Sequence, residues 1–148
     1  MSIDLAAFCA DLNTKGIDVL RLIFPDILGL TRSKDLLVSQ LVHAKSPAFC
    51  QGVWVTTTRG GVLDGNDIMS TGLPDMLTRI DPDTLTMMPW EPGVALVIAD
   101  IFNPDETPSE LAPRSVLANV IAQYAALGLS PVVGPELEFY IAEHDDET

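Results

Sequence analysis

The sequence is poor in basic residues and has no long hydrophobic run. It contains 8 lysines and arginines against 21 aspartates and glutamates, for a formal net charge of −13. Because no basic stripe is available to neutralise phosphates, we expect no nucleic-acid partner and no docking on an anionic membrane surface. Apolar runs such as Val94 to Ala99 are far shorter than the roughly 20 residues that a membrane-spanning helix needs.

Cysteine is also scarce, since only Cys9 and Cys50 are present. Nothing at the start resembles a signal peptide, because Asp4 interrupts the first apolar residues and no cleavage pattern follows. Two lone cysteines without such a leader predict reduced core thiols in a cytoplasmic protein. The composition, 47% hydrophobic and 20% charged, is typical of a folded chain, and 148 residues allow one small domain plus part of another.

The first hundred residues show the periodicities of a mixed α and β domain. An N-capping Asp4 and a stopping Gly16 delimit a first helix, and residues 39–44 form a weak helical turn. Strands are predicted at 17–24, 30–36, 53–57, 85–88 and 94–101. Residues 58–78 are rich in glycine and aspartate, and a connection of that length is usually functional or mobile.

A second unit follows the polar segment 103–112, which we interpret as a linker. Pro113 is a suitable first helical residue, an apolar stripe extends to Leu127, and Gly128 ends the helix. Residues 131–133 and 136–141 then read as strands, and the charged run 143–147 is expected to lie in water. The unit is too small to bury its own apolar stripe, so we expect an α+β domain over 1–108 and a truncated second domain over 109–148.

Two glutamates near the end form the most specific pattern. Alternation along a strand places Glu136 and Glu138 on one face, with their backbones about 6–7 Å apart. At that spacing each carboxylate can hold its own hard divalent cation in one cleft. A solvated strand face is the competing interpretation, and the two glutamates alone do not exclude it.

Five segments occur in an order that matches one known family. They are the hairpin from Arg21 to Lys34 (Arg21-Leu22-Ile23-Phe24-Pro25-Asp26-Ile27-Leu28-Gly29, then Arg32 and Lys34), Pro74-Asp75-Met76 with Asp81-Pro82-Asp83, Met88-Pro89-Trp90, Pro113-Arg114-Ser115-Val116-Leu117, and Gly134-Pro135-Glu136-Leu137-Glu138-Phe139-Tyr140. In this order they resemble the N-terminal part of the glutamine synthetase family. The last segment is the most specific, because it resembles the family's Gly-Pro-Glu-x-Glu-Phe motif.

The resemblance implies a fold and a reaction. Residues 1–108 would form a β-grasp domain, and 109–148 the first helix and strand of the catalytic domain. Members of the family use ATP to activate glutamate as an acyl phosphate, which ammonia or an amine displaces, with two Mg²⁺ or Mn²⁺ ions at the phosphates. Glu136 and Glu138 would each bind one of these metals, and Asp75 would lie near the amine site. Family members are homo-oligomers of stacked rings, in which a loop matching 58–78 reaches the neighbouring subunit's active site.

One departure from the family pattern concerns the amine. Glutamine synthetases carry Asp-Gly-Ser-Ser after the glycine that matches Gly52, and the aspartate of this motif helps to bind ammonium. In this chain the segment Val53 to Thr58 has a threonine in place of that aspartate. Asp64 or Asp67 could substitute only from a rearranged loop. The sequence therefore looks more like the γ-glutamylamide (γ-glutamylpolyamine) ligases, and we expect the 148 residues alone to be inactive. A stand-alone β-grasp interaction module, or a regulatory paralogue without catalysis, remains the alternative.

Overall fold

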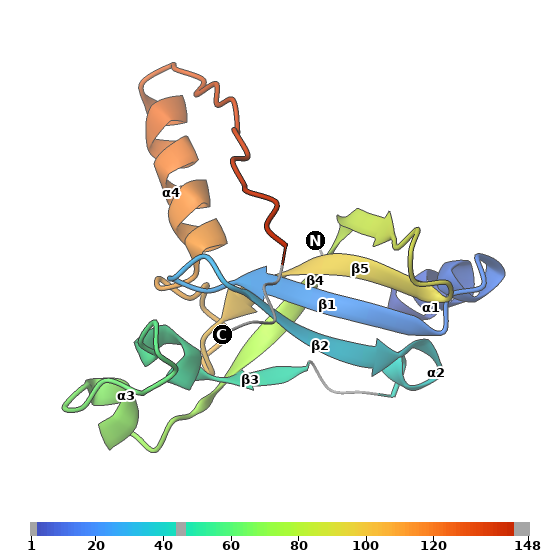
Figure 1. Cartoon of the computed structure of the whole chain (residues 1–148), viewed down its shortest axis with the longest axis horizontal. Helices are drawn as coiled ribbons and strands as arrows, with labels where there is room; N and C mark the ends of the chain where they lie inside the picture. Colours follow the sequence, from blue (N-terminus) through green and yellow to red (C-terminus); the bar gives the residue numbers. More distant parts are fainter. Residues whose placement is uncertain (1–2, 44–46, 144–148) are drawn as a thin grey trace.

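The computed structural model describes residues 3–43 and 47–143, and its centre is a five-stranded sheet (Figure 1). The strands are β1 (Val19–Pro25), β2 (Thr31–Leu37), β3 (Ala48–Cys50), β4 (Asp75–Met87) and β5 (Val94–Phe102). Their spatial order is β2-β1-β5-β4-β3. β1 pairs with β5 in parallel, and every other pair is antiparallel. The predicted α+β class and the β-grasp arrangement are confirmed.

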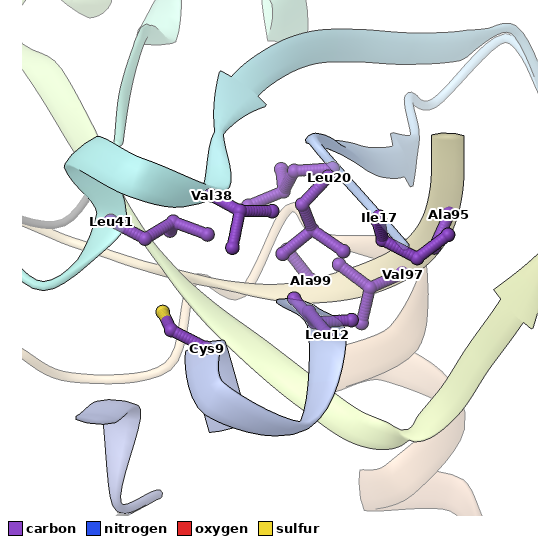
Figure 2. Close-up of a cluster of buried hydrophobic side chains, with 10 residues drawn as sticks. Cys9, Leu12, Ile17, Leu20, Val38, Leu41, Ala95, Val97 and Ala99 are labelled. Carbon is purple, nitrogen blue, oxygen red and sulfur yellow. The ribbon is translucent and has the colours of Figure 1, made fainter. Parts of the chain in front are cut away.

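Two helices cover one face of this sheet. The helix α1 (Leu5–Thr14) begins at Asp4, whose carboxylate accepts hydrogen bonds from the backbone of Ala6 and Ala7 as predicted for an N-cap. α2 (Val38–Leu41) is the predicted helical turn, of which residue 44 lies outside the described chain. The core between the helices and the sheet (Figure 2) consists of Cys9, Leu12, Ile17, Leu20, Leu22, Val38, Leu41, Ala95, Val97 and Ala99.

A second, smaller core lies at the other end of the sheet. Its buried members are Phe24, Trp54, Met76, Ile101 and Ala112. The ring of Phe24 meets Phe49 edge-on at 4.8 Å and Trp54 at 5.9 Å. Aromatic pairs in this geometry are favourable beyond the area they bury. This cluster fixes the position of η1 (Gln51–Val55) against the sheet.

The last helix projects away from the sheet (Figure 1). α4 (Pro113–Ala126) begins with Pro113 as predicted, but from Val116 onward every residue is exposed. Its uncovered large apolar side chains are Val116, Leu117, Val120, Ile121 and Tyr124. None of the helices in the described ranges is long and apolar enough to cross a membrane.

Three of the predicted strands, at 53–57, 131–133 and 136–141, are wrong. Residues 51–55 form a 3₁₀ helix, and only Thr56 makes an isolated bridge, to Val62. Residues 129–143 belong to no helix or strand, although 131–133 and 136–141 were expected to be strands. A strand needs a hydrogen-bonded neighbour, and no described strand pairs with this segment. The charged run at 143–147 falls outside the described chain except for Glu143, which is exposed.

Two further details differ from the expectation. The predicted strand at 85–88 is the end of β4, which begins at Asp75 and contains a register shift between Asp81 and Thr86. Such a bulge keeps one long strand in the sheet while displacing its middle. Cys9 is a buried free thiol as predicted, whereas Cys50 is free but exposed.

Candidate functional site

The predicted amine-site residue lies at the start of β4. Asp75 is exposed and stands opposite Cys50 in the β3–β4 ladder, and the backbone N–H of Gln51 donates to the carbonyl of Pro74 at 3.0 Å. Asp75 therefore lies beside η1. The structure brings together the two segments that the resemblance assigns to the amine site, namely Asp75 and the residues that follow Gly52.

The threonine in that segment is engaged locally. The hydroxyl of Thr56 donates to the carbonyl of Gly52 at 2.9 Å, across one turn of η1. Asp64 and Asp67, considered as substitutes for the missing family aspartate, are both exposed in the loop beyond it. The segment at η1 thus presents a hydroxyl and backbone groups, where a carboxylate would offer a full negative charge to a cation.

The long polar loop before β4 is organised into two turns. The N–H of Thr57 donates to the carbonyl of Gly61 at 2.7 Å, and Gly60 takes the positive φ of +80° that closes this turn. The short helix α3 (Asp67–Ser70) follows, and the Asn66 side chain caps it at the N–H of Met69. Much of residues 58–74 therefore has defined backbone structure on the outside of the protein.

The predicted metal ligands are separate from this region. Glu136 and Glu138 are exposed in the segment after α4, which belongs to no helix or strand. Among residues 3–43 and 47–143, no group of three or more histidine, cysteine, aspartate or glutamate side chains could hold a metal ion. The two carboxylates have the right chemistry for Mg²⁺ or Mn²⁺ but supply too few of about six oxygens, so the described residues do not assemble a metal site. Their role as ligands remains a prediction.

An ion-pair cluster at the base of α4 was missed by the sequence analysis. Arg114 Nε lies 2.7 Å from Asp100 Oδ1, and Arg114 Nη2 lies 2.6 Å from Asp81 Oδ2. Burial lowers the pKa of Arg114, but the bonds to Asp100 and Asp81 outweigh it and the pKa is raised. No periodicity signals this cluster, because its three residues lie on β4, β5 and α4 and meet only in the folded chain.

Comparison with known families supports the interpretation of the last segment. The family described as glutamine synthetase, catalytic domain, matches residues 110–148. This match begins just before α4 and includes Glu136 and Glu138.

Comparison with known proteins extends the likeness to most of the chain. A glutamine synthetase of Halobacterium salinarum is 34% identical over 93% of this chain and 29% of its own length. The Gamma-glutamylethanolamide synthetase GlnA4 of Streptomyces coelicolor is 32% identical over 84% of this chain and 28% of its own length. The chain thus spans less than a third of the length of these relatives.

Solved structures share the fold. One described as "GmaS/ADP complex-Conformation 1" has a TM-score of 0.62 and 26% identity, covering 85% of this chain and 26% of that one. Another, described as a novel glutamine synthase homolog, has a TM-score of 0.64 at 18% identity, covering 75% of this chain and 27% of that one. Sequence, catalytic-domain match and fold agree, and over the span that these relatives share with it the chain belongs to the glutamine synthetase family.

Proposed function

We propose that this chain is the first part of an ATP-dependent ligase that joins glutamate to ammonia or an amine through a γ-glutamyl phosphate. One observation supports this most directly: the catalytic-domain match over 110–148 coincides with the part of the chain that has no core of its own. Exposed apolar side chains along α4 favour burial against further protein. In this proposal residues 1–108 are the β-grasp domain and 109–148 begin the catalytic domain.

Glu136 and Glu138 are proposed as ligands to two divalent cations, Mg²⁺ or Mn²⁺. Both carboxylates are exposed and available to a metal, and the missing ligands would come from the remainder of the catalytic domain. Divalent cations in such sites offset the charge of transferring phosphates. The structural relative solved as an ADP complex is consistent with a nucleotide substrate.

The preferred co-substrate is proposed to be an organic amine. The family's ammonium-binding aspartate is absent, and Thr56 uses its hydroxyl within η1. Without that aspartate, the site has one carboxylate fewer to attract a small ammonium ion. Relatives of both kinds are almost equally similar, at 34% for a glutamine synthetase and 32% for GlnA4, so the missing carboxylate supports this proposal more than identity does.

Amine kinetics on the complete ligase test this preference. We expect kcat/KM for ethanolamine or putrescine to exceed that for ammonium, and Thr56→Asp to shift the ratio toward ammonium. Thr57→Asp serves as a matched control, because it adds the same charge one position away. A wild-type enzyme with its highest kcat/KM for ammonium would exclude the amine preference while leaving the ligase assignment intact.

A ring-forming homo-oligomer is proposed as the working state. The ordered turns of 57–61 and 66–72 lie on the outside of the protein, where they can reach a neighbouring subunit. Light scattering on the complete ligase should give a mass of several subunits. A monomer with full activity would contradict this proposal.

The assignment to a ligase is tested by the size of the protein in its source cell. An immunoblot against this 16.0 kDa chain should give a band at about 50 kDa, which leaves room for a complete catalytic domain on ordinary domain sizes. The purified protein should release ADP only when both glutamate and an amine are present. A band at the size of this chain, without such activity, would favour the stand-alone interaction module or the regulatory paralogue.

A further inference from the structure

The segment between β5 and α4 is packed onto the sheet. Ser109 and Ala112 are each only 2% exposed, and Ala112 belongs to the second core with Ile101. The N–H of Ser109 donates to the carbonyl of Ile101 at 2.9 Å, and Phe102 forms a bridge with Pro108. The polar composition of residues 103–112 suggests a free linker, but its second half is part of the folded body.

The first half of this segment is a closed turn. The N–H of Asn103 donates to the carbonyl of Thr107 at 2.8 Å, and the Asp105 carboxylate accepts from the N–H and hydroxyl of Thr107 at 3.0 and 2.6 Å. Side chains of Asp that bond the backbone two residues on stabilise such turns. The chain therefore reaches α4 along a fixed course.

Arg114 then ties the first turn of α4 to two strands. In the β4–β5 ladder Arg79 stands opposite Asp100 and Asp81 opposite Ile98, so Asp81 and Asp100 share a face of the sheet. The Arg114 guanidinium bonds both carboxylates, at 2.6 and 2.7 Å. A planar guanidinium that bonds two fixed acceptors restrains orientation as well as distance.

The bulge in β4 holds Asp81 in place for this contact. Asp81 Oδ1 accepts from the N–H of Asp83 at 3.2 Å, which leaves Oδ2 for Arg114. The hydroxyl of Thr84 donates to the carbonyl of Asp81 at 2.7 Å and accepts from the N–H of Ile98 at 2.8 Å. The register shift thus replaces ladder bonds with side-chain bonds and directs a carboxylate toward α4.

Beyond its first turn α4 has little support from the sheet. Only Pro113, Arg114 and Ser115 are partly buried, and every later residue of the helix is exposed. A cavity of about 220 Å³ lies between β5 and the first half of α4, and the residues that line it include Phe102, Ala118 and Asn119. The direction of α4 therefore depends on its first turn.

We propose that Arg114 is a positioning residue that fixes the direction in which α4 leaves the β-grasp sheet. β4, which it contacts through Asp81, begins at Asp75, and α4 leads along the chain to Glu136 and Glu138. One consequence rests on the proposed function. If that function holds, Arg114 sets the position of Glu136 and Glu138, the proposed metal ligands, relative to Asp75 at the proposed amine site. The restraint on α4 itself does not depend on any activity.

A distance measurement between spin labels tests the restraint. Labels on Ser33→Cys in β2 and Gln123→Cys in α4, both at exposed positions, report the sheet-to-helix distance by double electron–electron resonance. The background carries Cys50→Ser, which removes the exposed thiol, while Cys9 is buried. Arg114→Ala should broaden or shift the distance distribution, and Arg114→Lys should retain part of the restraint. An unchanged distribution in Arg114→Ala would overturn the proposal.

Arg79→Ala is the matched control. Arg79 lies on β4 and, like Arg114, pairs with a carboxylate: its partner is Glu106 at 3.0 Å, and neither residue belongs to α4. Its removal should leave the distance distribution unchanged, and circular dichroism confirms that each variant is folded. Broadening by Arg79→Ala to the same extent as Arg114→Ala would show general loosening and contradict a specific role for Arg114.

Kinetics of the complete ligase test the positioning role. Arg114→Ala should lower kcat by about 10- to 100-fold, because a misplacement of about 1 Å costs that much, while KM for ATP stays near the wild-type value. Arg114→Lys should restore part of kcat. Unchanged kcat despite a broadened distance distribution would remove the positioning role and keep the restraint. Lack of activity in the wild-type protein would instead refute the proposed function, and the spin-label result would still stand.

Discussion

Lys34 Nζ donates a hydrogen bond of 2.6 Å to the backbone carbonyl of Ala48, although β2 and β3 are the two edges of the sheet. The same ammonium lies 4.7 Å from the centre of the Phe49 ring. The sheet is therefore curled so strongly that its first and last strands approach each other. The Lys34 side chain connects the two edge strands at this point. In a closed barrel, a ladder of backbone hydrogen bonds would connect them instead.

Removal of this connection should cost measurable stability. Lys34→Ala eliminates a charge-assisted hydrogen bond and a cation–π contact, and we expect the free energy of unfolding to fall by about 1–2 kcal/mol. Urea unfolding followed by tryptophan fluorescence measures the change, because Trp54 lies in the core beside Phe49.

Lys15→Ala is the control for Lys34. Lys15 pairs with Asp11 one turn away on the exposed side of α1, at 2.6 Å. Such pairs contribute about 0.3–0.5 kcal/mol, so this variant should be nearly neutral. Equal losses for the two lysines would mean that the contact between the edge strands contributes nothing beyond surface charge.

Gly16 ends α1 in a conformation that disfavours other residues. Its φ is +72°, and no atom lies within 4 Å of the place where a Cβ would stand. Gly16→Ala should therefore lower stability by about 1 kcal/mol through backbone strain alone. Thermal unfolding of this variant beside Gly134→Ala tests the idea, because Gly134 has open space without a positive φ. A loss at both glycines would contradict the strain argument.

Asp26 is a buried carboxylate that organises the β1–β2 turn. It is 1% exposed and accepts from the N–H groups of Leu28 and Leu30, each at 2.9 Å, and from Arg32 at 2.7 and 2.8 Å. Burial raises the pKa of Asp26, but the bonds from Leu30, Arg32 and Leu28 outweigh it, and the pKa lies below its usual value. The carboxylate form is thus the one that stabilises the fold.

This lowered pKa predicts a pH dependence of defined sign. In the unfolded chain Asp26 binds its proton near the usual value of 3.8, whereas the folded chain binds it only at lower pH. The unfolded state then holds more protons in that window, so the stabilisation is complete above pH 3.8 and is lost as pH falls through the folded pKa. Urea unfolding from pH 6 down to pH 2 should show this loss.

Asp26→Asn separates the effect of protonating Asp26 from the effect of protonating the other carboxylates of the chain. The variant should be less stable by about 3 kcal/mol at pH 6, because it leaves Arg32 without its charged partner. The difference in the free energy of unfolding between the variant and the wild type should become smaller as the pH falls. Protonation of the many other carboxylates relieves repulsion in a chain of net charge −13 and affects both proteins alike. A difference that stays constant from pH 6 to pH 2 would contradict the assignment to Asp26.

Local sequence signals predicted the elements whose structure depends on local chemistry. Asp4 and Gly16 delimit α1, Pro113 starts α4, and the strand predicted at 17–24 from its apolar residues corresponds to β1. In the strand predicted at 53–57, Val53 to Val55 have strand-forming side chains but belong to η1, where Trp54 is buried in the aromatic core. Tertiary packing overrides β propensity in such cases.

The candidate site was predicted only in part. The resemblance pointed to Asp75 and to the residues after Gly52, and the fold places them side by side. Strand pairing for Glu136 and Glu138 could not follow from their alternation, since a strand depends on a neighbour that the described chain does not supply. Arg114 with Asp81 and Asp100 gave no local signal, because the three are 14 and more positions apart.

The 148-residue chain should bind divalent cations only weakly. Glu136 and Glu138 offer two exposed carboxylates, while Mg²⁺ and Mn²⁺ take about six oxygen ligands, so we expect a Kd for Mn²⁺ of about 1 mM or weaker. Titration of the free Mn²⁺ signal by electron paramagnetic resonance measures it. In the short chain, Glu136→Gln with Glu138→Gln should change this weak binding little, because the other exposed carboxylates of a chain of net charge −13 bind the cation just as loosely. The short chain should also release no ADP. In the complete ligase the double substitution should abolish activity. Micromolar binding that the double substitution removes would show that the two glutamates form a metal site without the rest of the catalytic domain.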